Sequence, residues 1–162
     1  MLIEAIYIAD VAGAGMRRVK EVMAVAKQGL AGDRYLRGEG HYSPMEDTCE
    51  VTLIEAEALE RMEAKFGVDV SEGQHRRNIV TRGVVHAELR ERRFAVGGVV
   101  MEFDRSRPPC GYLQRITEPG MTKAMGEGAG FCACILEGGV IHEGDGILLL
   151  PGESSRRVRR LP

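Results

Sequence analysis

Glycine interrupts the apolar segments of this 162-residue chain so often that long helices have little room to form. The chain contains 21 glycines and no tryptophan, and its apolar runs are short. Such runs between turn residues are typical of strands that turn tightly, as in a barrel or a sandwich. The length suits one domain with a sizeable core. We therefore predict one mostly β domain over residues 1–152 and a basic C-terminal tail over residues 153–162.

Individual segments fit a β-rich domain. Residues 2–9 indicate a first strand. Residues 19–30 fit helical spacing as well as a bent strand, and we favour the strand because a glycine-broken segment follows directly. Near the C-terminus, apolar runs at 131–137, 140–141 and 147–150 alternate with glycine-containing turns. This alternation predicts hairpins.

One or two short helices complete the prediction. Thr52 followed by Glu55 forms a capping-box signature, and an apolar face continues until Gly67, so a helix is expected between these positions. A second short helix is expected over residues 117–126.

Charge and hydropathy exclude several classes of protein. The net charge of −2 argues against a dedicated nucleic-acid binder, and no apolar run approaches 18 residues. The first residues carry no signal peptide, so we expect a cytoplasmic protein without membrane contact. In that compartment all four cysteines should be reduced, with Cys49, Cys132 and Cys134 in the core.

Cys110 is the strongest candidate for reactivity. It follows Pro108 and Pro109, which stiffen the loop, and Arg105 and Arg107 lie close in sequence. Only the thiolate attacks or binds metal, and nearby positive charge favours it. The alternative is a small apolar filler near a turn.

A second cationic cluster lies at Arg76-Arg77-Asn78. Guanidinium groups suit a phosphate or another oxyanion, although a salt-bridged surface is the alternative. If the strand has begun here, Arg76 and Asn78 share one face and Arg77 the other. The histidines at positions 41, 75, 86 and 142 lack the spacing of a metal site, so we expect surface or loop histidines.

An ordered set of segments resembles the MOSC domain, the C-terminal domain of molybdenum-cofactor sulfurases. The set runs from about residue 2 to residue 150, which suggests a small stand-alone bacterial member. The segments that carry the resemblance are Gly29-Leu30-Ala31-Gly32-Asp33-Arg34-Tyr35, Val51-Thr52-Leu53-Ile54-Glu55-Ala56-Glu57, Arg76-Arg77-Asn78-Ile79-Val80-Thr81-Arg82-Gly83, Phe94-Ala95-Val96-Gly97, Arg107-Pro108-Pro109-Cys110 and Gly138-Gly139-Val140-Ile141-His142-Glu143-Gly144-Asp145.

The resemblance implies a mostly β fold, a closed or partly open barrel of the pyruvate-kinase-barrel type, with Cys110 in a cleft. Cys110 would serve as the catalytic residue and as the metal ligand. The resemblance also implies that cofactor-binding residues lie around this cysteine. These residues are Gly32, Asp33, Arg34, Arg76, Arg77, Asn78 and Arg107.

Three functions follow as hypotheses. In the first, Cys110 holds molybdenum cofactor for the reduction of N-hydroxylated compounds, with electrons from an external reductase. In the second, Cys110 carries persulfide sulfur from a pyridoxal-phosphate-dependent desulfurase to a metal–sulfur cluster or cofactor under assembly. In the third, the protein is a non-catalytic module that binds an anion, and Cys110 is structural.

Overall fold

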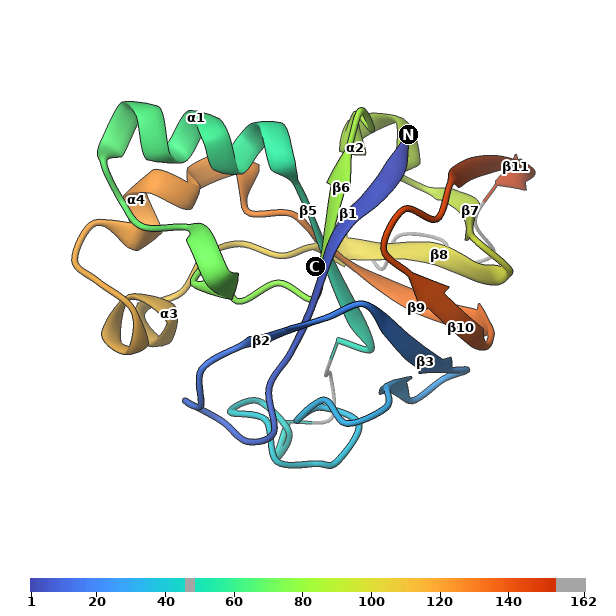
Figure 1. The fold of residues 1–162 in the computed structure, drawn as a ribbon, viewed down its shortest axis with the longest axis horizontal. Coiled ribbons are helices and arrows are strands. Elements are labelled where there is room, and N and C mark those ends of the chain that lie inside the picture. The colour runs from blue at the N-terminus through green and yellow to red at the C-terminus, as the bar shows by residue number, and fades with distance from the viewer. Residues whose placement is uncertain (46–48, 154–162) are drawn as a thin grey trace, which may run out of the picture.

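The computed structural model describes residues 1–45 and 49–153, and most of its strands belong to one large mixed sheet (Figure 1). Eight strands follow the order β11-β7-β8-β9-β5-β6-β1-β2, and a second sheet has the order β10-β3-β4. The strands are β1 (Leu2–Ile8), β2 (Arg17–Val19), β3 (Glu21–Val25), β4 (Gly29–Leu30), β5 (Val51–Glu55), β6 (Ile79–Arg82), β7 (Arg92–Val96), β8 (Val99–Ser106), β9 (Phe131–Glu137), β10 (Gly139–His142) and β11 (Ile147–Glu153).

The helices are few and short, and the larger ones gather at one side of the large sheet (Figure 1). They are α1 (Ala56–Phe66), α2 (His86–Leu89), α3 (Gly111–Ile116) and α4 (Met121–Met125), with 3₁₀ turns η1 (Ser71–Gly73) and η2 (Gly126–Gly128). No helix in the described part of the chain is both long enough and apolar enough to cross a membrane.

Two apolar clusters hold these layers together. The first packs strand residues from both sheets, among them Ile3, Leu53 and Phe94, all fully buried. The second lies under the helices, where Leu59 and Met62 of α1 pack near Met125 of α4. Burial of a large apolar side chain stabilises a fold by about 1.5–3 kcal/mol. The clusters therefore fix the sheet against the helices, and the loops at one end of the sheet carry the polar groups.

The prediction of a mostly β fold with few short helices is confirmed. The strand preference for residues 19–30 is also confirmed, because this segment contains β3 and β4. The hydrogen-bonded order of the large sheet has two ends, and no closed ring of strands is seen among the described residues. A single bridge from Leu2 to Gly146 joins the start of β1 to the turn before β11. The closed form of the predicted barrel is therefore not supported.

Three local predictions were wrong. Thr52 does not cap a helix, because it lies in β5, where its hydroxyl bonds the Asn78 side chain, and α1 starts only at Ala56. The helix expected over residues 117–126 is shorter, since α4 covers Met121–Met125.

The C-terminal strands also do not pair as hairpins. β9 pairs with β5 and β8, β10 pairs with β3, and β11 pairs with β7. Packing across the sheet, and not the glycine turns, decides these partners. The predicted basic tail lies outside the described residues except for Glu153, which ends β11.

Candidate functional site

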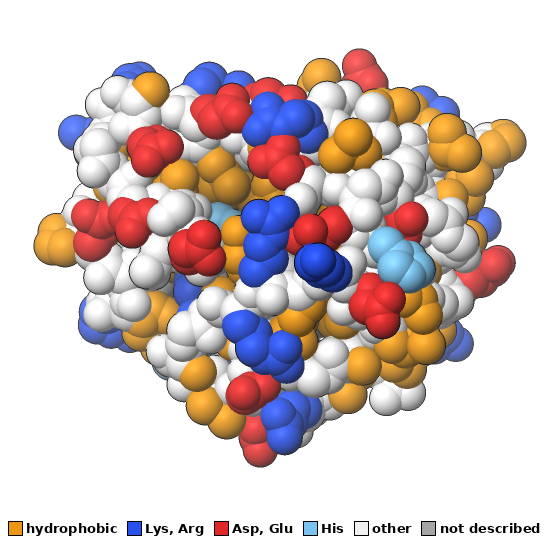
Figure 2. Space-filling model, in the orientation of Figure 1, with side chains coloured by type: hydrophobic (Ala, Val, Ile, Leu, Met, Phe, Trp, Pro, Cys, Tyr) orange, Lys and Arg blue, Asp and Glu red, His pale blue; other side chains and the backbone are white. Residues whose placement is uncertain are grey.

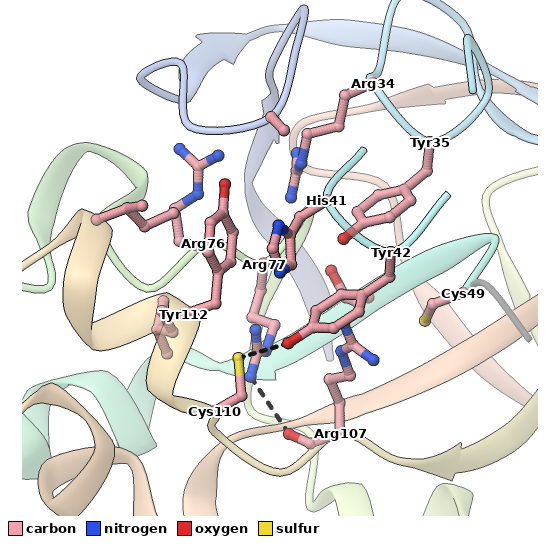
Figure 3. A pocket seen from close by; sticks show the side chains of 14 residues that line it. Arg34, Tyr35, His41, Tyr42, Cys49, Arg76, Arg77, Arg107, Cys110 and Tyr112 are labelled. Atoms are coloured by element: carbon pink, nitrogen blue, oxygen red, sulfur yellow. Dashed lines mark hydrogen bonds between the residues drawn. The ribbon is translucent and has the colours of Figure 1, made fainter. Parts of the chain in front are cut away.

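A hollow of about 490 Å³, open to solvent, lies between the loop that precedes α3, the segment before β6 and the loop that follows β4 (Figure 3). We call it the cationic pocket. Its lining residues are Ala12, Arg34, Tyr35, His41, Tyr42, Cys49, Thr52, Arg76, Arg77, Arg107, Cys110, Tyr112, Leu113 and Ile116.

Cys110 borders the cationic pocket and is partly buried. Pro108 and Pro109 lead into it in an irregular segment, and α3 begins at the next residue. The Tyr42 hydroxyl donates a hydrogen bond to Cys110 Sγ over 3.0 Å. Burial alone raises the pKa of the thiol, but the Tyr42 hydrogen bond, backbone N–H groups at the start of α3 and the charge of Arg107 together lower the pKa below its ordinary value. Cys110 is therefore disposed to ionise.

Arg77 is a buried cation, with only 5% of its surface exposed. Its Nε donates to the Ala129 carbonyl over 2.7 Å, and its Nη2 donates to the Arg107 carbonyl over 3.2 Å. No carboxylate of the described residues pairs with it. Burial, followed by the charge of Arg107, lowers the pKa of Arg77 to about 9. A buried charge without a counter-ion is costly, so an anion placed here would stabilise it.

Arg76 adds a second cation of the same kind. Its guanidinium donates to the Ala14 carbonyl, and no carboxylate of the described chain pairs with it. Burial, followed by the charge of Arg34, lowers the pKa of Arg76 to about 10. Its φ of 61° shows that the strand has not yet begun, and β6 starts only at Ile79. The alternation of faces expected for a strand therefore does not apply here, and Arg76 and Arg77 both line the cationic pocket.

Arg34 lines the pocket from a segment that hydrogen bonds hold in place. Asp33 Oδ1 accepts hydrogen bonds from Arg34 Nη1 over 3.0 Å and from Asn78 Nδ2 over 3.3 Å. Asp33 and Asn78 are buried and do not line the pocket, so they position Arg34 from behind. Gly32 does not line it either, and its φ of 80° suits the turn that leads to Asp33.

Sequence reasoning missed the aromatic wall of the pocket. His41 and Tyr112 stack in parallel with their ring centroids 3.6 Å apart, and Arg107 lies over the Tyr42 ring at 5.1 Å. Three of the four tyrosines of the chain, at positions 35, 42 and 112, line this one hollow. The sequence shows that tyrosine is scarce, but it does not show that three tyrosines meet at one pocket.

The expectation of four reduced cysteines is wrong for one pair. Cys49 and Cys132 form a disulfide that spans 83 residues of sequence, while Cys110 and Cys134 are not disulfide-bonded. The pairing of β5 with β9 sets Thr52 opposite Cys132, which brings the residues before β5 close to β9. Only this long-range pairing makes the contact, so no local sequence pattern indicates it.

Cys110 does not belong to a larger cluster of metal-ligating side chains in the described part of the chain. No group of three or more His, Cys, Asp or Glu side chains within residues 1–45 and 49–153 could hold a metal ion. A metal bound at Cys110 would therefore need most of its ligands from a larger organic group.

Solved structures resemble this fold closely. The YuaD protein of Bacillus subtilis superposes with a TM-score of 0.74 at 16% identity, over 90% of this chain and 93% of that one. YiiM of Geobacillus stearothermophilus gives a TM-score of 0.67 at 16% identity, over 91% and 75% of the two chains. YiiM of Escherichia coli gives 0.67 at 16% identity, over 96% and 72%.

At this identity the likeness concerns the fold alone, and no curated protein matches the chain. The sequence itself matches the model of the MOSC domain over residues 38–148, which include Cys110 and the arginines at positions 76, 77 and 107. This match covers more than half of the chain. The chain therefore belongs to the MOSC domain family.

Proposed function

We propose that the protein binds molybdenum cofactor in the cationic pocket, with Cys110 as the ligand from the protein to the metal. The observation that carries this proposal is the pairing of a thiol disposed to ionise with two buried guanidiniums that lack carboxylate partners in the described chain. A ligand with a phosphate at one end and a soft metal at the other would satisfy both.

The residues present fit such a group. Arg76 and Arg77 are buried cations without a carboxylate partner among the described residues, and Asp33 pairs with Arg34, which lines the same pocket. Guanidinium binds phosphate through paired hydrogen bonds. A thiolate is a soft ligand, which suits molybdenum better than a carboxylate would. These arginines would hold the phosphate, and Cys110 Sγ would meet the metal.

The reaction that best suits the pocket is the reduction of an N-hydroxylated compound to the amine. In that reaction the N–O bond breaks, two electrons arrive from an external reductase, and two protons yield the amine and water. The cofactor, when bound, supplies the centre that passes these electrons. The Tyr42 hydroxyl, 3.0 Å from Cys110 Sγ, would donate a proton to the departing oxygen. The stacked His41 and Tyr112 rings would form a flat wall against which the substrate could lie.

Sulfur carriage is the second candidate. Hydrogen-bond donors converge on Cys110 Sγ from Tyr42 and from the backbone of Tyr112 and Leu113. The same donors and cations would stabilise a persulfide anion on this cysteine, delivered by a pyridoxal-phosphate-dependent desulfurase.

Elemental analysis and intact mass, measured on protein freshly purified from a host that makes the cofactor, separate the candidates. We expect close to one molybdenum per chain together with a pterin, both lost in Cys110→Ser and in Arg77→Met. A matched variant, Arg82→Met, removes an arginine outside the pocket and should keep both. Absence of metal with a mass gain of one sulfur on Cys110 would favour sulfur carriage. Absence of both cargoes, with an anion still bound by Cys110→Ser, would leave a binding module.

A further inference from the structure

A second hollow, of about 560 Å³, lies on the opposite side of the segment that carries Arg76 and Arg77. It is a groove between α1, η1 and the strands β1 and β6, and Figure 2 shows its apolar floor and charged rim. The floor is formed by buried side chains that include Ala5, Leu59, Val70 and Val80. We call it the β1–β6 groove. It shares no lining residue with the cationic pocket.

His75 borders the groove in the loop between η1 and β6, as one alternative of the prediction had it, but it is only 1% exposed and is therefore not a surface histidine. Its Nδ1 accepts a hydrogen bond from the backbone N–H of Arg77 over 3.0 Å. Burial, followed by the charges of Arg77 and Arg76, lowers the pKa of His75 to about 3, so the ring is neutral at neutral pH. A neutral imidazole whose Nδ1 accepts must carry its proton on Nε2. No described residue accepts a hydrogen bond from that Nε2–H.

Tyr7 gives the groove a second polar atom. Its ring meets the His75 ring edge-on with centroids 5.3 Å apart, and the residue is 6% exposed. Burial, followed by a smaller opposing effect of Arg18, leaves the pKa of the Tyr7 hydroxyl above its ordinary value. Within the described chain this hydroxyl has no hydrogen-bond partner. Both residues line the groove, so these two polar atoms are the ones that a ligand bound there would meet.

The charges at the rim restrict what that ligand can be. Arg82 pairs with Glu4 and Glu60, and Arg18 pairs with Glu143 at 2.6 Å. These cations are already compensated, so the rim does not require an anion. The charges of Arg76 and Arg77 lie behind His75, which disfavours a cation against its ring. A neutral ligand with an apolar body suits the apolar floor and the neutral His75 ring, away from the rim carboxylates, which include Glu63.

We propose that the β1–β6 groove binds a small neutral aromatic molecule through a hydrogen-bond acceptor on its ring, which the Nε2–H of His75 recognises. The apolar floor contacts the body of the ligand, and the Tyr7 edge lies against one side of it. This site does not depend on the function proposed for the cationic pocket, and its ligand is distinct from any group held at Cys110.

Quinoline is a suitable probe, because it is neutral near pH 7.5 and carries one ring nitrogen as acceptor. Its matched control is N-methylquinolinium, which has the same rings but a positive charge and no acceptor lone pair. With ¹⁵N-labelled full-length protein, the imidazole nitrogens of His75 can be followed during titration to about 10 mM, well above a dissociation constant of about 1 mM. We expect a saturable shift of the His75 Nε2 signal with quinoline and none with N-methylquinolinium.

The variants sharpen the test. His75→Phe keeps a ring but removes the donor, and we expect quinoline affinity to fall at least tenfold. Tyr7→Phe removes only a hydroxyl and keeps the ring edge that contacts the ligand, so its fold is expected to survive and its affinity should stay close to that of the wild type. The proposal is overturned if the His75 signals of the wild type do not respond, if N-methylquinolinium binds as well as quinoline, or if quinoline shifts only residues of the cationic pocket. The wild-type titration decides by itself whether the proposal holds. The test therefore remains valid even if His75→Phe does not fold.

Discussion

Arg77 and Arg82 are five residues apart on one short segment, yet their surroundings are opposite. Arg82, at the end of β6, is partly exposed and contacts the carboxylates of Glu4, Glu57 and Glu60, and its hydrogen bond to Glu4 raises its pKa. Arg77 is buried among carbonyl groups without a carboxylate from the described chain, and its pKa is lowered to about 9.

The difference separates two uses of one residue type. A surface arginine that pairs with carboxylates adds little to stability. Its charge is already compensated by residues of the same chain. A buried, unpaired arginine costs folding free energy until an anion arrives, so its presence points to a ligand. We therefore place the candidate function at the cationic pocket, where buried arginines lack carboxylate partners among the described residues.

The largest expected effect comes from removing the Cys110 sulfur, which borders the same pocket as Arg76 and Arg77. In Cys110→Ser we expect complete loss of the fast iodoacetamide reaction and of any bound metal, because a serine hydroxyl does not ionise near neutral pH. Peptide mass spectrometry after brief alkylation measures the first loss. The melting temperature should stay within a few degrees of the wild type, and a large drop would show that Cys110 mainly supports the fold.

The next largest effect concerns acid stability. The pKa of His75 is about 3 in the folded protein, against an ordinary value of 6.5. Between these values the unfolded chain binds the extra proton, so stability is complete above about pH 6.5 and falls as pH drops towards 3. For His75 alone the loss from pH 7 to pH 4 is on the order of 3 kcal/mol.

Urea unfolding at both pH values, on wild type and His75→Phe, measures this loss. The variant should lose less stability over the same interval, because the carboxylates contribute equally to both proteins. His86→Phe is the matched control, since the pKa of His86 is lowered only to about 4 and its share should be smaller. Equal losses in wild type and His75→Phe would contradict the burial of a neutral ring beside the arginines.

The comparison itself is tested by Arg77→Met against Arg82→Met. Phosphate should raise the melting temperature of the wild type, and this gain should shrink in Arg77→Met, where the affinity is expected to fall at least tenfold. A charge-assisted hydrogen bond contributes about 1.5–3 kcal/mol, which corresponds to that factor or more. Arg82→Met should keep the phosphate effect in full. Equal losses in both variants would mean that the anion binds to general surface charge.

The smallest effect is expected from Tyr42→Phe. The variant removes the hydrogen bond to Cys110 Sγ but keeps the ring beneath Arg107. Loss of a hydrogen bond to a charged group of about 1.5 kcal/mol would lower the thiolate fraction at neutral pH roughly tenfold. The alkylation rate at pH 7 reports this fraction. An unchanged rate would mean that Arg107 and the backbone N–H groups stabilise the thiolate without a contribution from Tyr42.

What the sequence predicted well is local. Residues 2–9 indicate a strand, and β1 covers most of them. The prolines and Arg107 beside Cys110 are its neighbours along the chain, so their influence on the thiol can be inferred from the sequence alone. Even there, Tyr42, which is 68 residues away in sequence, lies against the sulfur in the folded protein.

What the sequence could not predict depends on contacts between distant segments. Thr52 and Glu55 have the spacing of a helix cap, but pairing of β5 with β6 and β9 is stronger than that local preference. Cys49 and Cys132 meet only because those strands are neighbours. Arg76 has a positive φ, so a rule for side chains on a regular strand could not place it.

The pH dependence of Cys110 alkylation shows whether this sulfur is ionised beside the buried arginines of the cationic pocket. Initial rates with iodoacetamide, resolved for the Cys110 peptide by mass spectrometry, give the pKa of this one thiol in the intact protein. We predict a midpoint below that of an ordinary cysteine, about 8.5, and a rise in that midpoint when Tyr42 is replaced by phenylalanine. A midpoint at or above the ordinary value in the wild type would contradict an ionised sulfur among unpaired cations, and with it the function proposed for the pocket.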